Sequence, residues 1–147
     1  MAAPAPARTR PEGADAGPGP TSTSFVEMIF PDQANHYGTL FGGNALSLMG
    51  KAAFVAATRC ARALVVMARA EKTDFHVPVC VGEIVEISAR VVRVGRSSMT
   101  VEVEMVAEAL LSGARRLAVR GAFEMVAVDA SGRPLPFHSI DSKDQNS

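Results

Sequence analysis

The spacing of apolar residues changes once along this chain, and that change limits the folds it can adopt. From Gly43 to about Arg62 the apolar residues recur at intervals of three and four, which is the period of an α-helix. After residue 63 the interval becomes two, as in residues 99–105, where apolar and polar residues alternate strictly. One helix followed by long alternating strands predicts an α+β fold, in which a curved antiparallel sheet wraps a single helix.

One expected strand precedes the helix, and the others follow it. The first strand spans residues 25–30 and stops at Pro31, and a loop follows over residues 31–42. The other strands are expected at residues 63–77 (one strand or two), 85–91, 99–105 and 117–128. The helix is rich in alanine and almost uncharged, so it is expected to be buried over most of its circumference. Its expected core residues are Leu46, Met49, Ala53, Ala56, Ala57 and Cys60.

The two ends of the chain differ in composition from its middle. Residues 1–23 are rich in Ala, Pro, Gly and Thr and have no periodic apolar positions, which predicts a disordered tail. A targeting peptide is a weaker alternative, because Glu12 and Asp15 accompany the two arginines of this segment. The folded domain is expected over residues 24–138, and a second, polar tail over residues 139–147.

Composition excludes several classes of function. The 147 residues are 48% hydrophobic, enough for one domain with a core, and 15 Lys and Arg balance 15 Asp and Glu. That balance argues against nucleic acid or an anionic membrane as a partner, and the absence of Trp argues against base stacking. Cys60 and Cys80 have neither metal-ligand spacing nor a disulfide framework. Without a signal sequence or an apolar run of about 20 residues, the expected location is cytoplasmic.

The junction between loop and helix is the first candidate site. Gly42 and Gly43 open the helix, where bare backbone N–H groups and the helix dipole favour negative charge. Such an arrangement polarises a carbonyl or holds an oxyanion during acyl transfer. The alternative is simple turn chemistry.

A glycine turn followed by an arginine is the second candidate site. In Gly95-Arg96-Ser97-Ser98 a guanidinium and two hydroxyls are suited to a phosphate group. The alternative is a hairpin with a solvated arginine. The histidines His36, His76 and His138 are scattered, which serves metal binding poorly and favours structural or surface roles.

Residues 29–53, 74–105 and 129–136 together resemble the hotdog-fold acyl-CoA thioesterases, in the branch of small bacterial and organellar acyl-CoA hydrolases. The resemblance covers about residues 25–136, with the motifs in the family's order. It implies a long central helix rolled in an antiparallel sheet, an acyl-CoA substrate with coenzyme A as product, and no metal or other cofactor. It also implies an active site at the interface of a homodimer, with assembly into a trimer of dimers.

The resemblance also implies roles for single residues. Asn35 matches the asparagine that orients the thioester carbonyl or the attacking water, and Gly42 and Gly43 match the helix start that polarises the carbonyl. Substrate and coenzyme A contacts are implied for Thr39, His76, Arg96, Ser97 and Ser98.

Gly50 departs from the family's pattern. A glycine inside a helix costs about 1 kcal/mol relative to alanine, and the family has a catalytic acid here. The chain is then an engineered variant, a natural inactive paralogue, or an enzyme that uses another base. Candidates for that base are His36, Asp32, Asp74 and Glu27. Two functions stay open, a weakened acyl-CoA hydrolase and a non-catalytic acyl-CoA binder, while a hotdog enoyl-CoA hydratase fits less well because its Asp–His motif is absent.

Overall fold

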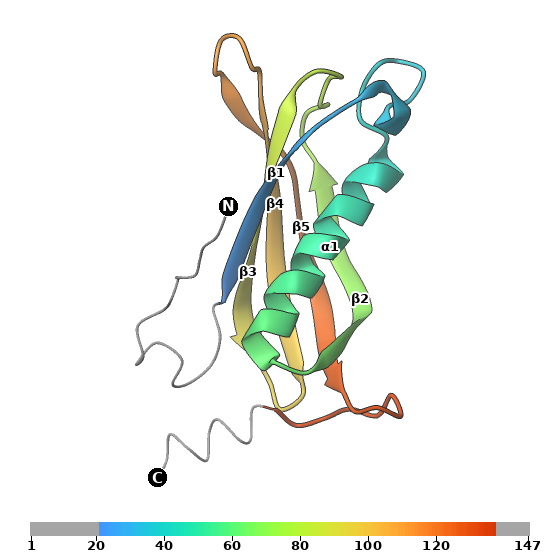
Figure 1. Ribbon diagram of the computed structural model, residues 1–147, viewed down its shortest axis with the longest axis vertical. Helices are drawn as coiled ribbons and strands as arrows, with labels where there is room; N and C mark the ends of the chain where they lie inside the picture. Colours follow the sequence, from blue (N-terminus) through green and yellow to red (C-terminus); the bar gives the residue numbers. More distant parts are fainter. Residues whose placement is uncertain (1–20, 138–147) are drawn as a thin grey trace, which may run out of the picture.

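The computed structural model describes residues 21–137 of the chain. It confirms the predicted α+β fold, because one helix packs on one face of a five-stranded antiparallel sheet (Figure 1). The sheet order is β1-β3-β4-β5-β2, which makes β1 and β2 its edges. The elements are β1 (Ser22–Met28), the 3-10 turn η2 (Pro31–Gln33), α1 (Gly42–Ala61), β2 (Leu64–Phe75), β3 (Ile84–Val94), β4 (Ser98–Glu108) and β5 (Arg115–Val128).

The first strand begins earlier than its sequence suggests. Ser22 and Thr23, which were expected in the tail, pair with Arg90 and Ala89 of β3. Their polar side chains hide the strand from a search for apolar alternation, yet an edge strand tolerates them. Thr23 is also tied to the helix, since its hydroxyl accepts a hydrogen bond of 2.7 Å from Arg59. Residues 1–20 of the expected N-terminal tail, His138 and the C-terminal tail lie outside the described residues.

The core lies between α1 and the sheet. On β4 the alternation predicted from sequence is confirmed, because every second residue from Met99 to Ala107 is at most 1% exposed. The expectation that α1 is buried over most of its circumference is wrong for this chain. One helix can turn only one face to one sheet, and the buried residues of α1 are Ala45, Leu48, Met49, Ala52, Ala53, Ala56, Ala57 and Cys60.

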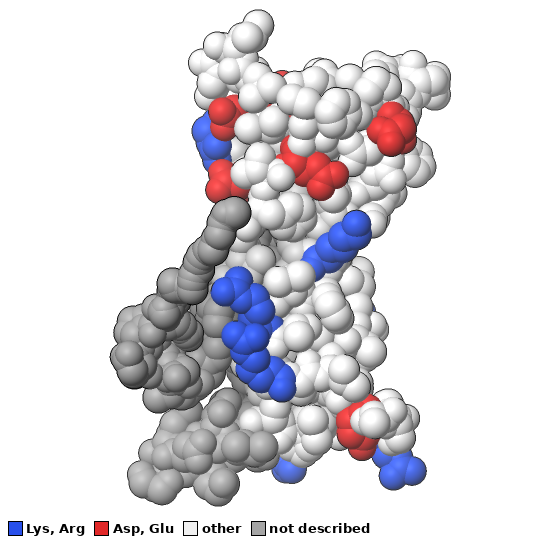
Figure 2. Space-filling view, viewed as in Figure 1, with Lys and Arg blue, Asp and Glu red and all other residues white. Residues whose placement is uncertain are grey.

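Apolar side chains remain exposed on the other face of α1 and on the neighbouring edge strand. Leu46, expected in the core, is 40% exposed, and Phe54 is 47% exposed. On β2, Val66 and Met67 are similarly exposed. Figure 2 shows that most of the surface over α1 carries no charged side chain. The chain therefore presents an apolar surface beside an unpaired sheet edge.

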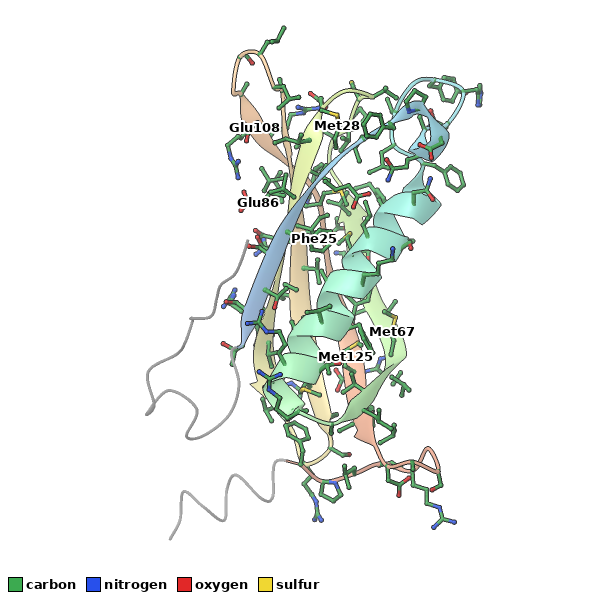
Figure 3. All side chains as sticks on the ribbon, in the orientation of Figure 1. Phe25, Met28, Met67, Glu86, Glu108 and Met125 are labelled. Carbon is green, nitrogen blue, oxygen red and sulfur yellow. The ribbon has the colours of Figure 1, made fainter. Side chains whose placement is uncertain are left out.

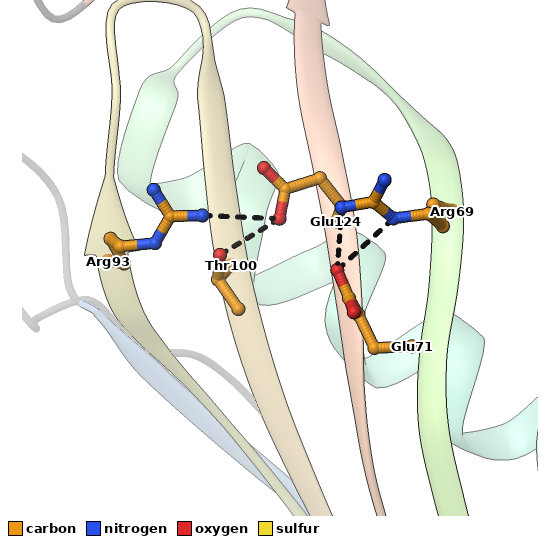
Figure 4. Close-up of polar contacts among 5 residues, drawn as sticks. All are labelled: Arg69, Glu71, Arg93, Thr100 and Glu124. Carbon is orange, nitrogen blue, oxygen red and sulfur yellow. Dashed lines mark hydrogen bonds and ion pairs between the residues drawn. The ribbon is translucent and has the colours of Figure 1, made fainter.

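The sheet face away from α1 is polar and crossed by ion pairs. Glu124 of β5 accepts a hydrogen bond of 2.9 Å from the Thr100 hydroxyl and lies 3.9 Å from the Arg93 guanidinium (Figure 4). Arg69 and Glu71 form a second pair at 2.9 Å on β2. Such exposed pairs contribute little stability each, but they set this face apart from the apolar one. None of the helices in the described part has both the length and the apolar character needed to cross a membrane.

Candidate active site

A pocket of about 270 Å³ opens beside the start of α1. The loop before the helix, its first turn, the segment after β2 and strand β5 all contribute to its wall. The lining residues are Leu40, Gly42, Ala45, Phe75, His76, Val77, Pro78, Val79 and Val119. The wall is mainly apolar, which suits an acyl chain or a pantetheine arm better than a charged group. The structure thus brings together the predicted site residues Gly42 and His76.

The first turn of α1 carries unused backbone donors. No side chain caps the helix at Phe41, and the first helical hydrogen bond runs from the Ala45 N–H to the Phe41 carbonyl at 3.0 Å. The N–H groups of Gly42 and Gly43 precede that bond, so they lack a helical acceptor. A β-carbon on Gly43 would lie 2.8 Å from the Phe41 ring. Glycine therefore lets the chain turn closely around Phe41 while these donors stay available to a carbonyl oxygen.

Asn35 shapes the loop that precedes the helix. Its Oδ1 accepts hydrogen bonds from the Tyr37 N–H at 2.9 Å and from the Thr39 N–H and hydroxyl at 3.2 Å each. The amide nitrogen of Asn35 donates to no group within residues 21–137. The side-chain oxygen is thus used to fold the loop, and the amide nitrogen is the part left to act on a ligand. Thr39 is engaged with Asn35 and does not line the pocket.

A half-buried ion pair holds the segment that forms one wall of the pocket. Arg116 of β5 donates to both carboxylate oxygens of Glu83, at 2.8 and 3.0 Å, and to the Pro78 carbonyl at 2.9 Å. Glu83 also accepts from the Cys80 N–H at 2.8 Å. The hydrogen bond from Arg116 lowers the pKa of Glu83, an effect that partial burial opposes. Sequence analysis missed this pair, because only the folded sheet brings the two residues together.

Gly50 lies away from this pocket within a single chain. It is half-buried on the side of α1 that faces β2, where the Met67 methyl would lie 3.4 Å from an added β-carbon. Figure 3 shows Met67 on β2 beside α1. Ala53, three positions after Gly50 in α1, is fully buried in the core, as expected. Seven residues of helix separate Gly50 from Gly43, a rise of about 10 Å.

The predicted phosphate-binding turn, between β3 and β4, lies at the opposite end of the sheet from the start of α1 (Figure 1), beside which the pocket opens. The turn itself forms as expected, since the Gly95 N–H donates to the Ser98 carbonyl at 2.7 Å. Arg96 is exposed, and the Ser97 carbonyl accepts from the Ala127 N–H at 2.7 Å. One chain alone does not bring Arg96, Ser97 and Ser98 to the start of α1.

None of the four candidates for a replacement base lines the pocket. His36 is exposed, with its ring centroid 4.0 Å from that of Tyr37, and Asp32 is exposed in η2. Glu27 accepts a hydrogen bond of 3.1 Å from Gln33. Asp74 lines a separate hollow on the polar face of the sheet.

Comparison with known proteins identifies the family. The model of the thioesterase superfamily matches residues 37–114. The chain belongs to this superfamily. A Bacillus subtilis protein that is named an uncharacterized acyl-CoA thioester hydrolase is 36% identical over 111 residues, which are 76% of this chain and 64% of the relative. The chain therefore spans less than two thirds of the length of that relative.

Solved structures agree with this family assignment. A hexameric thioesterase of Yersinia pestis has a TM-score of 0.74 at 31% identity. The match covers 81% of this chain and 97% of the Y. pestis chain. An acyl-CoA hydrolase of Staphylococcus aureus was solved with butyryl coenzyme A and coenzyme A. It has a TM-score of 0.73 at 31% identity, and the match covers 77% of this chain and 69% of the S. aureus chain. Mutants of that enzyme carry alanine for an asparagine, for an aspartate fifteen positions later, and for a threonine seventeen positions after that.

Proposed function

We propose that this chain is an acyl-CoA thioester hydrolase that has lost the helix acid of its family and turns over slowly. The observation that carries the proposal is the apolar pocket at the start of α1, where Gly42 lies in the wall. Family membership adds the reaction class, because the B. subtilis relative is named an acyl-CoA thioester hydrolase.

The described residues suggest how the thioester would be held. Its carbonyl oxygen would accept hydrogen bonds from the N–H groups of Gly42 and Gly43, which stabilise the negative charge that develops during attack. The Asn35 amide nitrogen would donate to the same oxygen or orient the attacking water. Attack by water on the carbonyl carbon then breaks the bond from carbon to sulfur and releases the acid and the thiol of coenzyme A.

The spacing of residues supports the loss of the helix acid. In this chain Asn35 and Gly50 lie fifteen positions apart, as do the mutated asparagine and aspartate of the S. aureus enzyme. Met67 follows Gly50 by seventeen positions, the separation of that aspartate from the mutated threonine. On this spacing, glycine and methionine would stand where the S. aureus enzyme has a carboxylate and a hydroxyl. General-base help is worth about 10²–10⁴ in rate, so its loss predicts slow turnover.

We also propose that the working unit is a homodimer, which assembles further into a trimer of dimers. The exposed apolar residues of α1 and the unpaired edge of β2 lie side by side, and a second copy would cover both. The hexameric Y. pestis relative supports assembly beyond a dimer. In such an assembly, Arg96, Ser97 and Ser98 of one copy would lie at the pocket of another copy, although they lie far from the pocket of their own chain. Sedimentation that shows only monomer at micromolar concentration would contradict this proposal.

Two measurements on the unmodified chain test the function. Release of free thiol from acyl-CoAs of several chain lengths reports hydrolysis, and calorimetry reports binding. We expect micromolar binding together with slow release above the buffer rate. The missing acid at Gly50 favours one competing function, a non-catalytic acyl-CoA binder, which predicts binding with no release. Absence of binding would contradict both functions. A cytoplasmic location stays a prediction, supported by two cysteines that form no disulfide in the described part.

A further inference from the structure

Of the nine residues that line the pocket, one has an ionisable side chain, His76. We propose that His76 is the general base of this chain and replaces the family's helix acid, whose position Gly50 occupies. The proposal rests on the proposed hydrolase function and adds the group that accepts the proton. Histidine suits this task because it changes charge between about pH 5 and 8.

The position of His76 is fixed relative to the start of α1. The preceding residue, Phe75, places its ring 3.8 Å from the point that a β-carbon on Gly42 would occupy. The His76 N–H donates to the Ala118 carbonyl at 2.7 Å, so β5 anchors the backbone. Pro78 follows His76 by two residues, and its carbonyl accepts a hydrogen bond of 2.9 Å from Arg116. His76 therefore enters the pocket wall on a segment that is braced on both sides.

The side chain of His76 is available for proton transfer. Within residues 21–137 its imidazole takes part in no hydrogen bond or ion pair. Among residues 21–137, no other ionisable side chain lines the pocket. Asp74, two residues before His76, lines the separate hollow on the polar face of the sheet. Glu83 and Arg116, which brace the segment after β2, are occupied with each other.

The reaction balances with water as the only co-reactant. The neutral imidazole accepts a proton from water while the water oxygen forms a bond to the thioester carbonyl carbon. The intermediate oxyanion is held by the N–H groups of Gly42 and Gly43. When it collapses, the bond from carbon to sulfur breaks, and the imidazolium returns its proton to the leaving sulfur. The products are a carboxylic acid and the free thiol.

The test compares His76→Gln with the full unmodified chain. Gln keeps hydrogen-bonding capacity but cannot accept the proton, so thiol release should fall by about 10²-fold, the lower range for general-base loss. Acyl-CoA affinity by calorimetry should change by less than about threefold, since proton transfer occurs in the transition state. His36→Gln is the matched control, and it should retain the rate.

Added imidazole gives a second readout. It should restore part of the rate in His76→Ala, which opens space for it, and not in His36→Ala. Equal rates for His76→Gln and the unmodified chain would overturn the proposal. So would an unmodified chain that binds acyl-CoA without hydrolysing it, a result that leaves the binding function standing. Failure of the unmodified chain to bind acyl-CoA would overturn the proposed function itself.

Discussion

The methyl carbon of Met67 lies 3.4 Å from the position that a β-carbon on Gly50 would occupy. That distance is an ordinary van der Waals contact, so nothing within one chain requires glycine at this position. A larger side chain at residue 50 would extend past an apolar neighbour, between α1 and the edge strand β2. Gly50 is therefore explained better by a lost functional group than by lack of space.

This contact predicts the effect of a methyl group on stability. Replacing Gly50 with alanine should raise the free energy of unfolding by about 0.5–1 kcal/mol, because alanine is the better helix former. Thermal unfolding of the two chains measures the difference. A lower melting temperature for Gly50→Ala would mean that a second copy packs closely against Gly50, and it would move the explanation from lost chemistry to interface packing.

Asn35 allows loop folding and chemistry to be separated. Asn35→Asp keeps an oxygen that can accept from Tyr37 and Thr39, but it loses the donating amide nitrogen. We expect its melting temperature to stay close to that of the unmodified chain while thiol release falls at least tenfold. Asn35→Ala should lose both properties, with a cost in stability of about 1 kcal/mol. Undiminished hydrolysis by Asn35→Asp would limit Asn35 to a structural role.

The ion pair between Glu83 and Arg116 predicts a pH dependence of stability. Arg116 lowers the pKa of Glu83 in the folded chain, so the ionised carboxylate favours folding. This contribution is fully present above the pH range in which glutamate titrates when unfolded, and it is lost as pH falls through the lowered pKa. Glu83→Gln should therefore cost about 1 kcal/mol near neutral pH, and less below about pH 4.

Thermal melts between pH 3 and 7 measure this difference. Glu71→Gln is the control, because its pair with Arg69 is exposed on the surface and should contribute little at any pH. A constant gap between Glu83→Gln and the unmodified chain across the whole range would show that packing, not charge, links Glu83 to Arg116.

Arg96 should matter for binding and not for folding. It is exposed and belongs to no ion pair in the described part of the chain, so Arg96→Ala should leave the melting temperature unchanged. If Arg96 reaches the phosphates of coenzyme A bound to another copy, its loss should weaken binding by about 1.5–3 kcal/mol. Arg62→Ala, at the end of α1, is the matched control and should bind normally. Equal affinities for Arg96→Ala and the control would remove Arg96 from the site.

The sequence predicted the helix and the strands better than it predicted where they start and which of their residues are covered. The single helix and the long strands followed from the two periods, because one face of each element packs into the core. The start of β1 was missed, since Ser22 and Thr23 lie on an edge where polar side chains are tolerated. Leu46 was placed in the core because periodicity identifies apolar positions without showing which of them a partner covers.

For the site, the sequence predicted motifs of adjacent residues, but it did not predict contacts between residues that are distant in the chain. Gly42 belongs to a motif that the sequence indicates, whereas a ligand contact for His76 is implied only by the family resemblance, and the fold joins the two residues in one pocket. The pair of Glu83 and Arg116 has no local signature, because sheet pairing alone brings β5 to the turn before β3. The roles proposed for Asn35, Arg96, Ser97 and Ser98 stay predictions.

We propose that Gly50 stands where a catalytic carboxylate belongs, and Gly50→Asp tests this most directly. An added carboxylate would lie beside the Met67 methyl, and partial burial there would raise its pKa and make it a stronger base. Steady-state thiol release by the unmodified, Gly50→Asp and Gly50→Asn chains should be compared over several acyl-CoAs. We expect a rate about 10²-fold higher for Gly50→Asp alone, with little change in affinity. Equal rates in all three chains would contradict it.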